Sequence, residues 1–247
     1  MDFTGKTVVV TGGSSGIGRA TVLNFANAGG NVYFGDVNEQ GAEETLSQAE
    51  GLAGNVTFRK LDLEDEASIA EFAGALHGSG GKADVVANVA GWDQQQPFTD
   101  NTPDFMVKVI NINLMGCIRL TRAFLDPMIE AQSGAIVNVS SDAGRVGSSG
   151  ETVYSGAKGG IIGFTKSLAR EMARYQIRAN VVAPGPTDTP LFREQSEKYQ
   201  AALIRAIPLR RPADPAEISD AILFFASDRA SYITGQVLSV SGGLTMV

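Results

Sequence analysis

Two side chains suited to proton transfer, Tyr154 and Lys158, lie four residues apart. Residues at this spacing share one face of a helix, about 5–6 Å apart at Cβ. A free tyrosine has a pKa of about 10, and a neighbouring cation favours the phenolate and lowers that pKa. The pair can therefore move a proton on or off an alcohol oxygen, to which Ser141 can donate a hydrogen bond. The alternative is an ordinary amphipathic helix start, because Tyr-x-x-x-Lys also occurs by chance.

The elements that must position these residues alternate along the chain. Short apolar runs rich in β-branched residues predict buried parallel strands, and the segments between them carry apolar residues at helical spacing. A polar stretch over 187–212 is expected to be mobile and without regular structure. The strands are predicted at 7–11, 31–36, 56–61, 84–88, 135–140, 177–182 and 237–240, and the helices at 19–28, 39–50, 67–76, 104–129, 152–174 and 214–226.

This alternation predicts an α/β fold, a doubly wound, Rossmann-type sheet of seven parallel strands with helices on both faces. A chain of 247 residues can bury a sizeable core. No linker, low-complexity tract or internal repeat divides it. Residues 1–247 are therefore expected to form a single dinucleotide-binding and catalytic domain.

Composition excludes several classes of protein. The net charge is −7 without a cluster of Lys and Arg, which argues against nucleic acid as a partner. The one cysteine, Cys117, and the one histidine, His77, exclude an intrachain disulfide, a cysteine-rich zinc site and a His-based triad, so no metal is expected. We expect Cys117 to be a packed small residue and His77 a solvated loop residue. With neither a signal-like N-terminus nor a run of roughly 18 apolar residues, the chain is expected to be cytoplasmic and independent of membranes.

A glycine-rich turn between the first predicted strand and helix has the spacing Gly12-x3-Gly16-x-Gly18. In this context backbone N–H groups and the helix dipole face a dinucleotide pyrophosphate. Asp36 ends the second predicted strand, where a carboxylate can accept both adenosine ribose hydroxyls and would repel a 2′-phosphate. The turn lacks Arg or Lys, and Val37 stands where a basic residue would serve NADP. NAD is therefore favoured over NADP, although a strand-end aspartate can also simply cap a turn.

Several short motifs occur in one order at characteristic intervals: Thr11-Gly12-x3-Gly16-x-Gly18, Asn88-x-Ala90-Gly91, Asn113, Ser141, Tyr154-x3-Lys158 and Pro184-Gly185. By these motifs the chain resembles the short-chain dehydrogenase/reductase family over essentially its full length. One position departs from the family pattern, since Val89 stands where the family usually has a second asparagine. Because Asn88 is kept, this change is expected to cost little.

The resemblance implies a role for each matching residue. Tyr154 would be the general acid/base, Lys158 would lower its pKa and bind the nicotinamide ribose, and Ser141 would orient the substrate oxygen. Asn113 would hold a water in a proton relay. The implied cofactor-binding residues are Gly12, Ser14, Ser15, Gly16, Ile17, Gly18, Asp36, Val37, Asp62, Leu63, Asn88, Ala90, Gly91, Tyr154, Lys158, Pro184, Gly185, Thr187 and Thr189. A homotetramer, or a hetero-oligomer with a related subunit, is expected by the same analogy.

The stretches 90–93, 141–151, 184–189 and 233–246 resemble the branch of the family that oxidises ring-bearing 3-hydroxyacyl-CoA thioesters. Examples of such substrates are 2-hydroxycyclohexanecarboxyl-CoA and 2-(hydroxy(phenyl)methyl)succinyl-CoA. The resemblance thus suggests NAD-dependent oxidation of a cyclic or aryl 3-hydroxyacyl-CoA in the degradation of aromatic or alicyclic acids. One alternative is a 3-oxoacyl-carrier-protein reductase, although Asp36 argues against the NADPH that such an enzyme would normally prefer. A non-enzyme alternative is a catalytically silent NAD-binding subunit.

Candidate substrate residues follow from the same resemblance. Trp92, Val146, Leu191 and Phe192 would supply apolar area, and Gln94 and Ser149 polar contacts. Trp92 packed under a loop is the alternative for that residue. Arg145, Arg193 and Lys198 are candidates to meet CoA phosphates, with solvated surface charges as the alternative.

Overall fold

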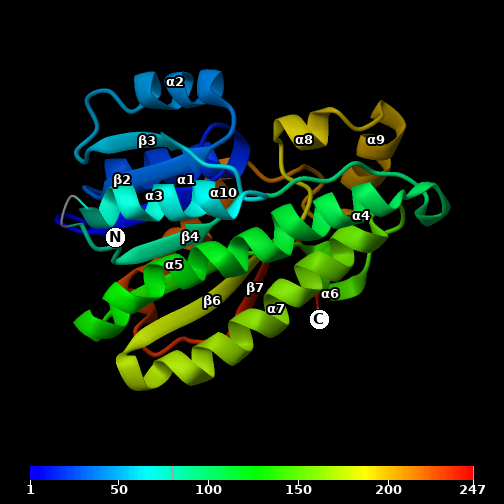
Figure 1. The fold of residues 1–247 in the computed structure, drawn as a ribbon. Helices are drawn as coiled ribbons and strands as arrows, with labels where there is room; N and C mark the ends of the chain where they lie inside the picture. The colour runs from blue at the N-terminus through cyan, green and yellow to red at the C-terminus, as the bar shows by residue number, and fades with distance from the viewer. Residues whose placement is uncertain (79–80, 247) are drawn as a thin grey trace.

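The computed structural model describes residues 1–78 and 81–246. Its centre is one sheet of seven parallel strands in the order β3-β2-β1-β4-β5-β6-β7 (Figure 1). This order confirms the predicted doubly wound α/β fold. The strands are β1 Thr7–Thr11, β2 Asn31–Asp36, β3 Val56–Lys60, β4 Val85–Asn88, β5 Gly134–Val139, β6 Ile177–Pro184 and β7 Val237–Val240.

Helices follow the strands in sequence and cover both faces of the sheet (Figure 1). The α-helices are α1 Gly16–Asn27, α2 Glu39–Gln48, α3 Glu66–Gly78, α4 Pro103–Ile110, α5 Gly116–Ala131, α6 Asp142–Val146, α7 Thr152–Met172, α8 Pro190–Arg193, α9 Glu197–Ala206 and α10 Pro215–Ala226. A π-helical turn, η2 Asn111–Met115, joins α4 to α5, and short 3-10 turns are η1 Phe98–Asp100, η3 Ala173–Tyr175 and η4 Asp228–Ala230.

The sheet divides the core into two layers because successive strand residues face opposite sides. Val8 and Val10 of β1 pack with α1 and α10, whereas Val9 packs with α3, α5 and α7. On β2, Phe34 joins the first layer and Tyr33 the second. The runs of β-branched and aromatic residues are thus buried on both faces, as parallel strands require.

The strand order reverses at β1, which pairs with β2 on one side and β4 on the other. In a doubly wound sheet the ligand crevice lies outside the carboxyl ends of the strands at such a point. Thr11, Asp36, Asn88 and Val139 end β1, β2, β4 and β5. The fold therefore gathers the predicted glycine turn, acidic strand end and serine segment at one edge.

Two segments differ from the sequence prediction. The helix predicted over 104–129 is interrupted after Ile110 by the π turn η2. The stretch 187–212, expected to lack regular structure, contains α8 and α9. Its helix starts are capped by side chains, since Phe192 N donates to Thr189 Oγ1 and Tyr199 N to Ser196 Oγ, each at 3.3 Å.

The single histidine is not a solvated loop residue. His77 lies in the last turn of α3, half-buried, with its ring edge-to-face on Phe124 at 5.3 Å between centroids. The prediction of a loop was wrong because the helix continues into the Gly/Ser-rich stretch. Cys117, by contrast, is buried in α5, which confirms a packed small residue. Within the described residues, no helix is long and apolar enough to cross a membrane.

Candidate active site

A cavity of about 940 Å³ lies at the carboxyl edge of the sheet. The glycine turn and Asp36 form one part of its wall, and Ser141, Tyr154 and Lys158 another. Most of the predicted cofactor, catalytic and substrate residues line this one space: Gly12, Ser15, Gly16, Ile17, Gly18, Asp36, Val37, Asp62, Leu63, Ala90, Gly91, Trp92, Ser141, Val146, Tyr154, Lys158, Pro184, Gly185, Thr187, Thr189, Leu191 and Phe192.

The glycine turn needs its glycines because other backbone comes close to it. Gly12 has φ +74°, and a Cβ there would lie 2.8 Å from Ala90 Cα. A Cβ on Gly18 would collide with the Gly12 carbonyl oxygen. The turn thus leads directly into α1, whose N-terminal N–H groups suit a pyrophosphate. These residues fit a dinucleotide cofactor.

We expect Gly18→Ala to weaken NADH binding by roughly 10- to 100-fold, because overpacking of this size costs about 1–3 kcal/mol and must displace the turn. The matched control is Gly74→Ala in α3, where an added Cβ meets nothing within 4 Å. That control should raise the free energy of unfolding by about 0.5–1 kcal/mol and leave NADH binding unchanged. NADH titration by fluorescence, with thermal unfolding beside it, gives both values. Wild-type NADH affinity in Gly18→Ala would contradict the assignment of the turn.

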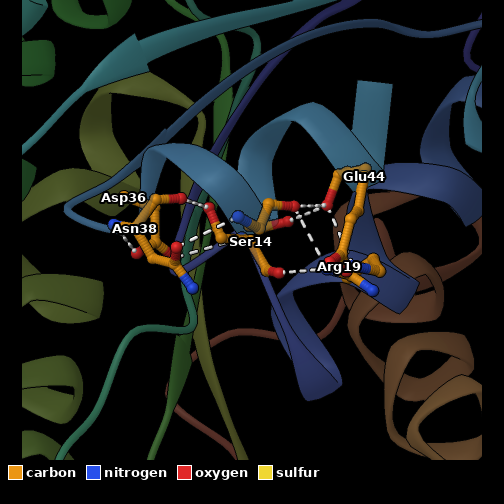
Figure 2. Close-up of polar contacts among 8 residues, drawn as sticks. Ser14, Arg19, Asp36, Asn38 and Glu44 are labelled. Carbon is orange, nitrogen blue, oxygen red and sulfur yellow. Dashed lines mark hydrogen bonds and ion pairs between the residues drawn. The ribbon is translucent and has the colours of Figure 1, made fainter. Parts of the chain in front are cut away.

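Asp36 reaches from the end of β2 to the glycine turn (Figure 2). Its Oδ2 accepts a hydrogen bond from Ser14 N at 3.0 Å, and its Oδ1 accepts one from Asn38 N at 2.9 Å. A carboxylate has about four acceptor positions, so each oxygen can still accept a ribose hydroxyl. Asp36 therefore both ties the turn together and presents an anion to the cavity.

Arg19, which the sequence reasoning missed, is tied to the backbone behind the turn (Figure 2). Its Nη2 donates to Ser14 O at 2.5 Å, Gly41 O at 3.1 Å and Glu44 Oε2 at 2.8 Å, and its Nε to Thr45 Oγ1 at 3.0 Å. The guanidinium thus braces α1 against α2. Ser14, predicted to bind the cofactor, lies outside the cavity wall, and its hydroxyl donates to the Asn38 carbonyl at 2.8 Å.

Asn88 lies beneath the cavity rather than along it. Its Nδ2 donates to Thr121 Oγ1 at 3.0 Å and to Asn138 Oδ1 at 2.8 Å, and the residue is buried. Thr11 Oγ1 accepts from the backbone N–H groups of Val89 and Ala90, each at 3.0 Å. The side chain of Val89 belongs to the hydrophobic core, so an apolar residue is accommodated there without loss of a polar contact.

Ser141, Tyr154 and Lys158 come together as the sequence predicts. Lys158 Nζ lies 5.6 Å from the centre of the Tyr154 ring and donates to Val139 O at 3.0 Å. Ser141 caps α6, its Oγ accepting from Ala143 N at 3.1 Å. Because that bond uses a lone pair, the Ser141 hydroxyl can still donate its proton, either to the Tyr154 phenol or to a substrate oxygen.

The prediction that Lys158 lowers the pKa of Tyr154 is wrong, because in the structure this pKa is raised. Burial raises the pKa of Tyr154, the carboxylates of Glu151 and Asp93 raise it further, and a hydrogen bond with Ser141 opposes the rise. Burial also lowers the pKa of Lys158 to about 8. The phenol is therefore the resting form, which suits proton donation to a carbonyl oxygen.

Asn113 lies in the π turn, where such local irregularities often serve function. Its Oδ1 accepts from Trp92 N at 3.1 Å, and its Nδ2 donates to Trp92 O at 2.6 Å and Val109 O at 2.9 Å. The side chain is buried and outside the cavity wall. It therefore fixes the loop after β4, and a relay water would have to use another atom of the residue.

Two acidic residues in the cavity wall, Asp93 and Glu151, were missed by the sequence reasoning. Asp93 is only 9% exposed, and within the described residues its Oδ2 has no hydrogen-bond partner. Burial, opposed by the Gln94 N–H and reinforced by Glu151, raises the pKa of Asp93 to about 6. Glu151 is the N-cap of α7, three residues before Tyr154, and could have been noticed in the sequence, whereas Asp93 comes from a distant segment that only the fold brings near Tyr154.

The predicted substrate residues divide into two groups. Trp92, Val146, Leu191 and Phe192 line the cavity, whereas Gln94 and Ser149 do not. The Trp92 ring also packs against α4, with centroid distances of 5.7 Å to the Phe105 ring and 4.2 Å to Lys108 Nζ, and its contact with substrate stays a prediction.

The three basic residues considered for CoA phosphates also divide. Arg145 is largely buried and pairs with Asp142 at 3.0 Å, so it is not a surface phosphate contact. Arg193 pairs with Asp188 at 2.7 Å, and Lys198 is exposed.

Comparison with known proteins agrees with this fold and site. A family model described as enoyl-(acyl carrier protein) reductase matches residues 12–245, and the chain belongs to the short-chain dehydrogenase/reductase family. It is therefore an oxidoreductase of a family that uses a nicotinamide cofactor.

The individual relatives carry reductase names. The 3-oxoacyl-[acyl-carrier-protein] reductase of Thermotoga maritima is 39% identical over 246 residues and all of both chains. The enzyme of the same name from Escherichia coli is 36% identical over 247 residues, again covering both fully. Among solved structures, 3-oxoacyl-[acyl-carrier protein] reductase from Brucella melitensis has a TM-score of 0.93 at 33% identity, covering 100% of this chain and 93% of its own. Levodione reductase has the same score and identity, covering 98% of each chain.

Proposed function

We propose that this oxidoreductase interconverts a 3-oxoacyl thioester and the corresponding 3-hydroxyacyl thioester with NAD(H). The observation that carries the proposal is the convergence of Ser141, Tyr154 and Lys158 on one cavity that also contains the glycine turn and Asp36. The names of the relatives support a 3-oxoacyl substrate and favour reduction over the oxidation suggested by the sequence. We also propose that residues 1–247 act as one domain, in the cytoplasm, as a homotetramer.

The residues of this chain position the substrate and handle its proton. The nicotinamide, when bound, supplies or takes up the hydride. Ser141 would donate a hydrogen bond to the reacting oxygen, and Tyr154 would give that oxygen its proton during reduction. Lys158, whose Nζ lies 5.6 Å from the centre of the Tyr154 ring, is the cation that can return a proton to the Tyr154 phenolate after the transfer. Asn113 keeps the loop at Trp92 in place.

The preference for NAD rests on charge at the end of β2. Asp36 faces the cavity with a carboxylate, and Val37 beside it is 57% exposed and apolar. Arg19, the basic residue behind the turn, is already bound to Glu44 and to backbone carbonyls. Lys60, opposite Asp36 on β3, is paired with Glu39 at 2.8 Å. Among the described residues, the cations near Asp36 are thus already paired, and its carboxylate disfavours a 2′-phosphate, which supports NAD over NADP.

The direction of the reaction should depend on pH in a specific way. Because the pKa of Tyr154 is raised, reduction should be fast at neutral pH and oxidation should speed up as the pH rises. In Glu151→Gln the removal of one nearby carboxylate lowers that pKa, so the midpoint of the oxidation profile should move to lower pH. The pH dependence of kcat/KM for wild type and variant measures the shift. A midpoint that stays in place or moves upward would refute the electrostatic account.

The substrate can be specified further by the identity of its acyl group and of the carrier to which that group is attached. The relatives favour an acyl carrier protein. A second candidate, a ring-bearing acyl-CoA, is favoured by the apolar wall that Trp92, Val146, Leu191 and Phe192 contribute. Arg145 is buried and paired with Asp142, so it is not available to bind the phosphates of either carrier.

A panel of substrates tests this proposal. Initial rates should be compared for acetoacetyl-CoA, acetoacetyl-acyl-carrier-protein, 2-oxocyclohexanecarboxyl-CoA and a simple cyclic ketone, cyclohexanone, each with NADH and NADPH. Turnover of the carrier-protein thioester with NADH supports the first candidate, and a clear preference for the ring-bearing thioester supports the second. If simple cyclic ketones react as well as any thioester, the thioester proposal fails although the family assignment stands.

A further inference from the structure

A buried polar cluster connects the catalytic serine segment to the end of the chain. Asp142 directly follows Ser141 and is 4% exposed. Its Oδ2 accepts from Thr245 Oγ1 at 2.5 Å, and its Oδ1 accepts from Ser239 Oγ at 2.8 Å. Arg145, one turn later in α6, donates through Nη1 to Asp142 Oδ1 at 3.0 Å and to Thr245 Oγ1 at 2.9 Å. We call these four residues, Asp142, Arg145, Ser239 and Thr245, the tail clamp.

The tail clamp joins segments that are about a hundred residues apart in sequence. Ser239 lies in β7, the edge strand of the sheet, and Thr245 follows β7 and is placed beside α6 by its bonds to Asp142 and Arg145. Thr245 Oγ1 donates to the Asp142 carboxylate and accepts from the Arg145 guanidinium, so one hydroxyl is a hydrogen-bond partner of both charged groups. A buried carboxylate and guanidinium require such saturation, because an unpaired buried charge is costly.

The opposite side of α6 is fixed by α7. A Cβ on Gly144 would lie 2.6 Å from the backbone carbonyl carbon of Lys158, so the two helices are in direct backbone contact. Ser140 Oγ also donates to Lys158 O at 2.7 Å. The short helix that begins at Ser141 is thus held between the helix that carries Tyr154 and the C-terminal tail. A five-residue helix has little stability of its own, so these outside contacts decide its position.

We propose that the tail clamp is a positioning device for catalysis, in which Thr245 and the Asp142–Arg145 pair hold the Ser141 hydroxyl in line with the Tyr154 phenol. Asp142 and Thr245 also line the cavity, but the positioning role does not require them to touch the reacting atoms. The segment after β7, through Thr245, then helps to position a catalytic group. This inference rests on the proposed role of Ser141 and Tyr154, and it does not depend on which acyl group the enzyme takes.

The physical reason lies in the geometry that proton transfer demands. A displacement of about 1 Å at a catalytic group can reduce the rate by 10²-fold. Loss of the Thr245 hydroxyl leaves Asp142 Oδ2 without its hydrogen-bond donor. The Asp142–Arg145 pair must then shift until water can hydrogen-bond to this oxygen. Because α6 moves with Asp142, the bond from Ser141 to Tyr154 is weakened. That bond lowers the pKa of Tyr154, so its loss raises the pKa.

The test compares Thr245→Val, Thr245→Ser and wild type. Thr245→Val keeps the shape and removes the hydroxyl, and we expect kcat to fall roughly 10- to 100-fold while NADH affinity is retained. The pH midpoint for oxidation should move upward, the same direction as in Ser141→Ala. Thr245→Ser restores the hydroxyl and should regain kcat to within about twofold with the wild-type midpoint. The control is Thr234→Val, far from α6, where the hydroxyl meets only the backbone of Ala179.

The outcomes separate this inference from the proposed function. Hydrogen exchange at Ala143 and Gly144, whose amides bond to Ser141, needs no substrate and should become faster in Thr245→Val than in wild type. If wild type reduces none of the thioesters while exchange still responds, the proposed function fails and the clamp stands as a structural device. If Thr245→Val keeps wild-type kcat and pH midpoint, or if Thr234→Val loses as much activity, the positioning role is overturned.

Discussion

Replacing Tyr154 by phenylalanine is expected to lower kcat by roughly 10²–10⁴-fold, the range for loss of a positioned general acid. The change removes only the phenol oxygen, and the ring continues to fill its place beside Lys158. NADH binding should therefore be retained, because the glycine turn and Asp36 are untouched. Steady-state rates with a 3-oxoacyl thioester, together with an NADH titration, separate the two effects.

The control for this variant is Tyr232→Phe. Tyr232 is fully exposed and distant from the cavity wall, so the same loss of an oxygen should leave kcat unchanged. If Tyr154→Phe retains more than about a tenth of wild-type kcat, Tyr154 is not the proton donor, and the assignment of the catalytic group must be abandoned.

The second large effect concerns the choice of cofactor. The double variant Asp36→Ser, Val37→Arg should raise the ratio of NADPH to NADH efficiency by roughly 100-fold or more. Two effects contribute to this expectation. Asp36→Ser removes the repulsion between the carboxylate and the 2′-phosphate of NADPH, and Val37→Arg adds a guanidinium that can bind this phosphate. Each hydrogen bond to a charged group contributes about 1.5–3 kcal/mol. The ratio of kcat/KM for the two cofactors is the measurement.

A matched control is available on the neighbouring helix. Glu43→Gln removes one exposed carboxylate from α2 outside the cavity wall and should not change the cofactor ratio. An equal change in Glu43→Gln would mean that overall charge, rather than Asp36, sets the preference. A double variant whose ratio of NADPH to NADH efficiency stays at the wild-type value would remove the argument for Asp36.

The fold was accessible from the sequence because its signals are local and repeated. Val8, Val9 and Val10 are apolar on both faces, which only a covered parallel strand explains. The glycine turn and the Tyr154–Lys158 pair were recognisable for the same reason, since each is a short motif within one element. The π turn that contains Asn113 was not predicted, because the apolar residues over 104–129 recur at helical spacing without a proline or glycine at Asn111–Met115 to mark an interruption.

Side-chain roles that depend on distant segments could not be predicted. Asn88 was expected along the cofactor and Asn113 was expected to hold a relay water, and the structure adds contacts that the sequence does not reveal. The Asn88 Nδ2 donates to Thr121 and Asn138, and the Asn113 amide binds the backbone of Trp92. Arg145 was a candidate phosphate contact and instead pairs with Asp142 within α6, where Thr245, about a hundred residues further along the chain, also binds both side chains. Likewise, the pKa of Tyr154 depends in part on Asp93, which only the fold brings near it.

The most direct test of the central claim is the initial rate of NADH oxidation by wild-type protein after addition of a 3-oxoacyl thioester at neutral pH, with Tyr154→Phe measured beside it. The account predicts rapid thioester-dependent NADH consumption that is absent in the variant, and slower consumption of NADPH. Equal rates for wild type and Tyr154→Phe, or reduction that proceeds only with NADPH, would contradict it.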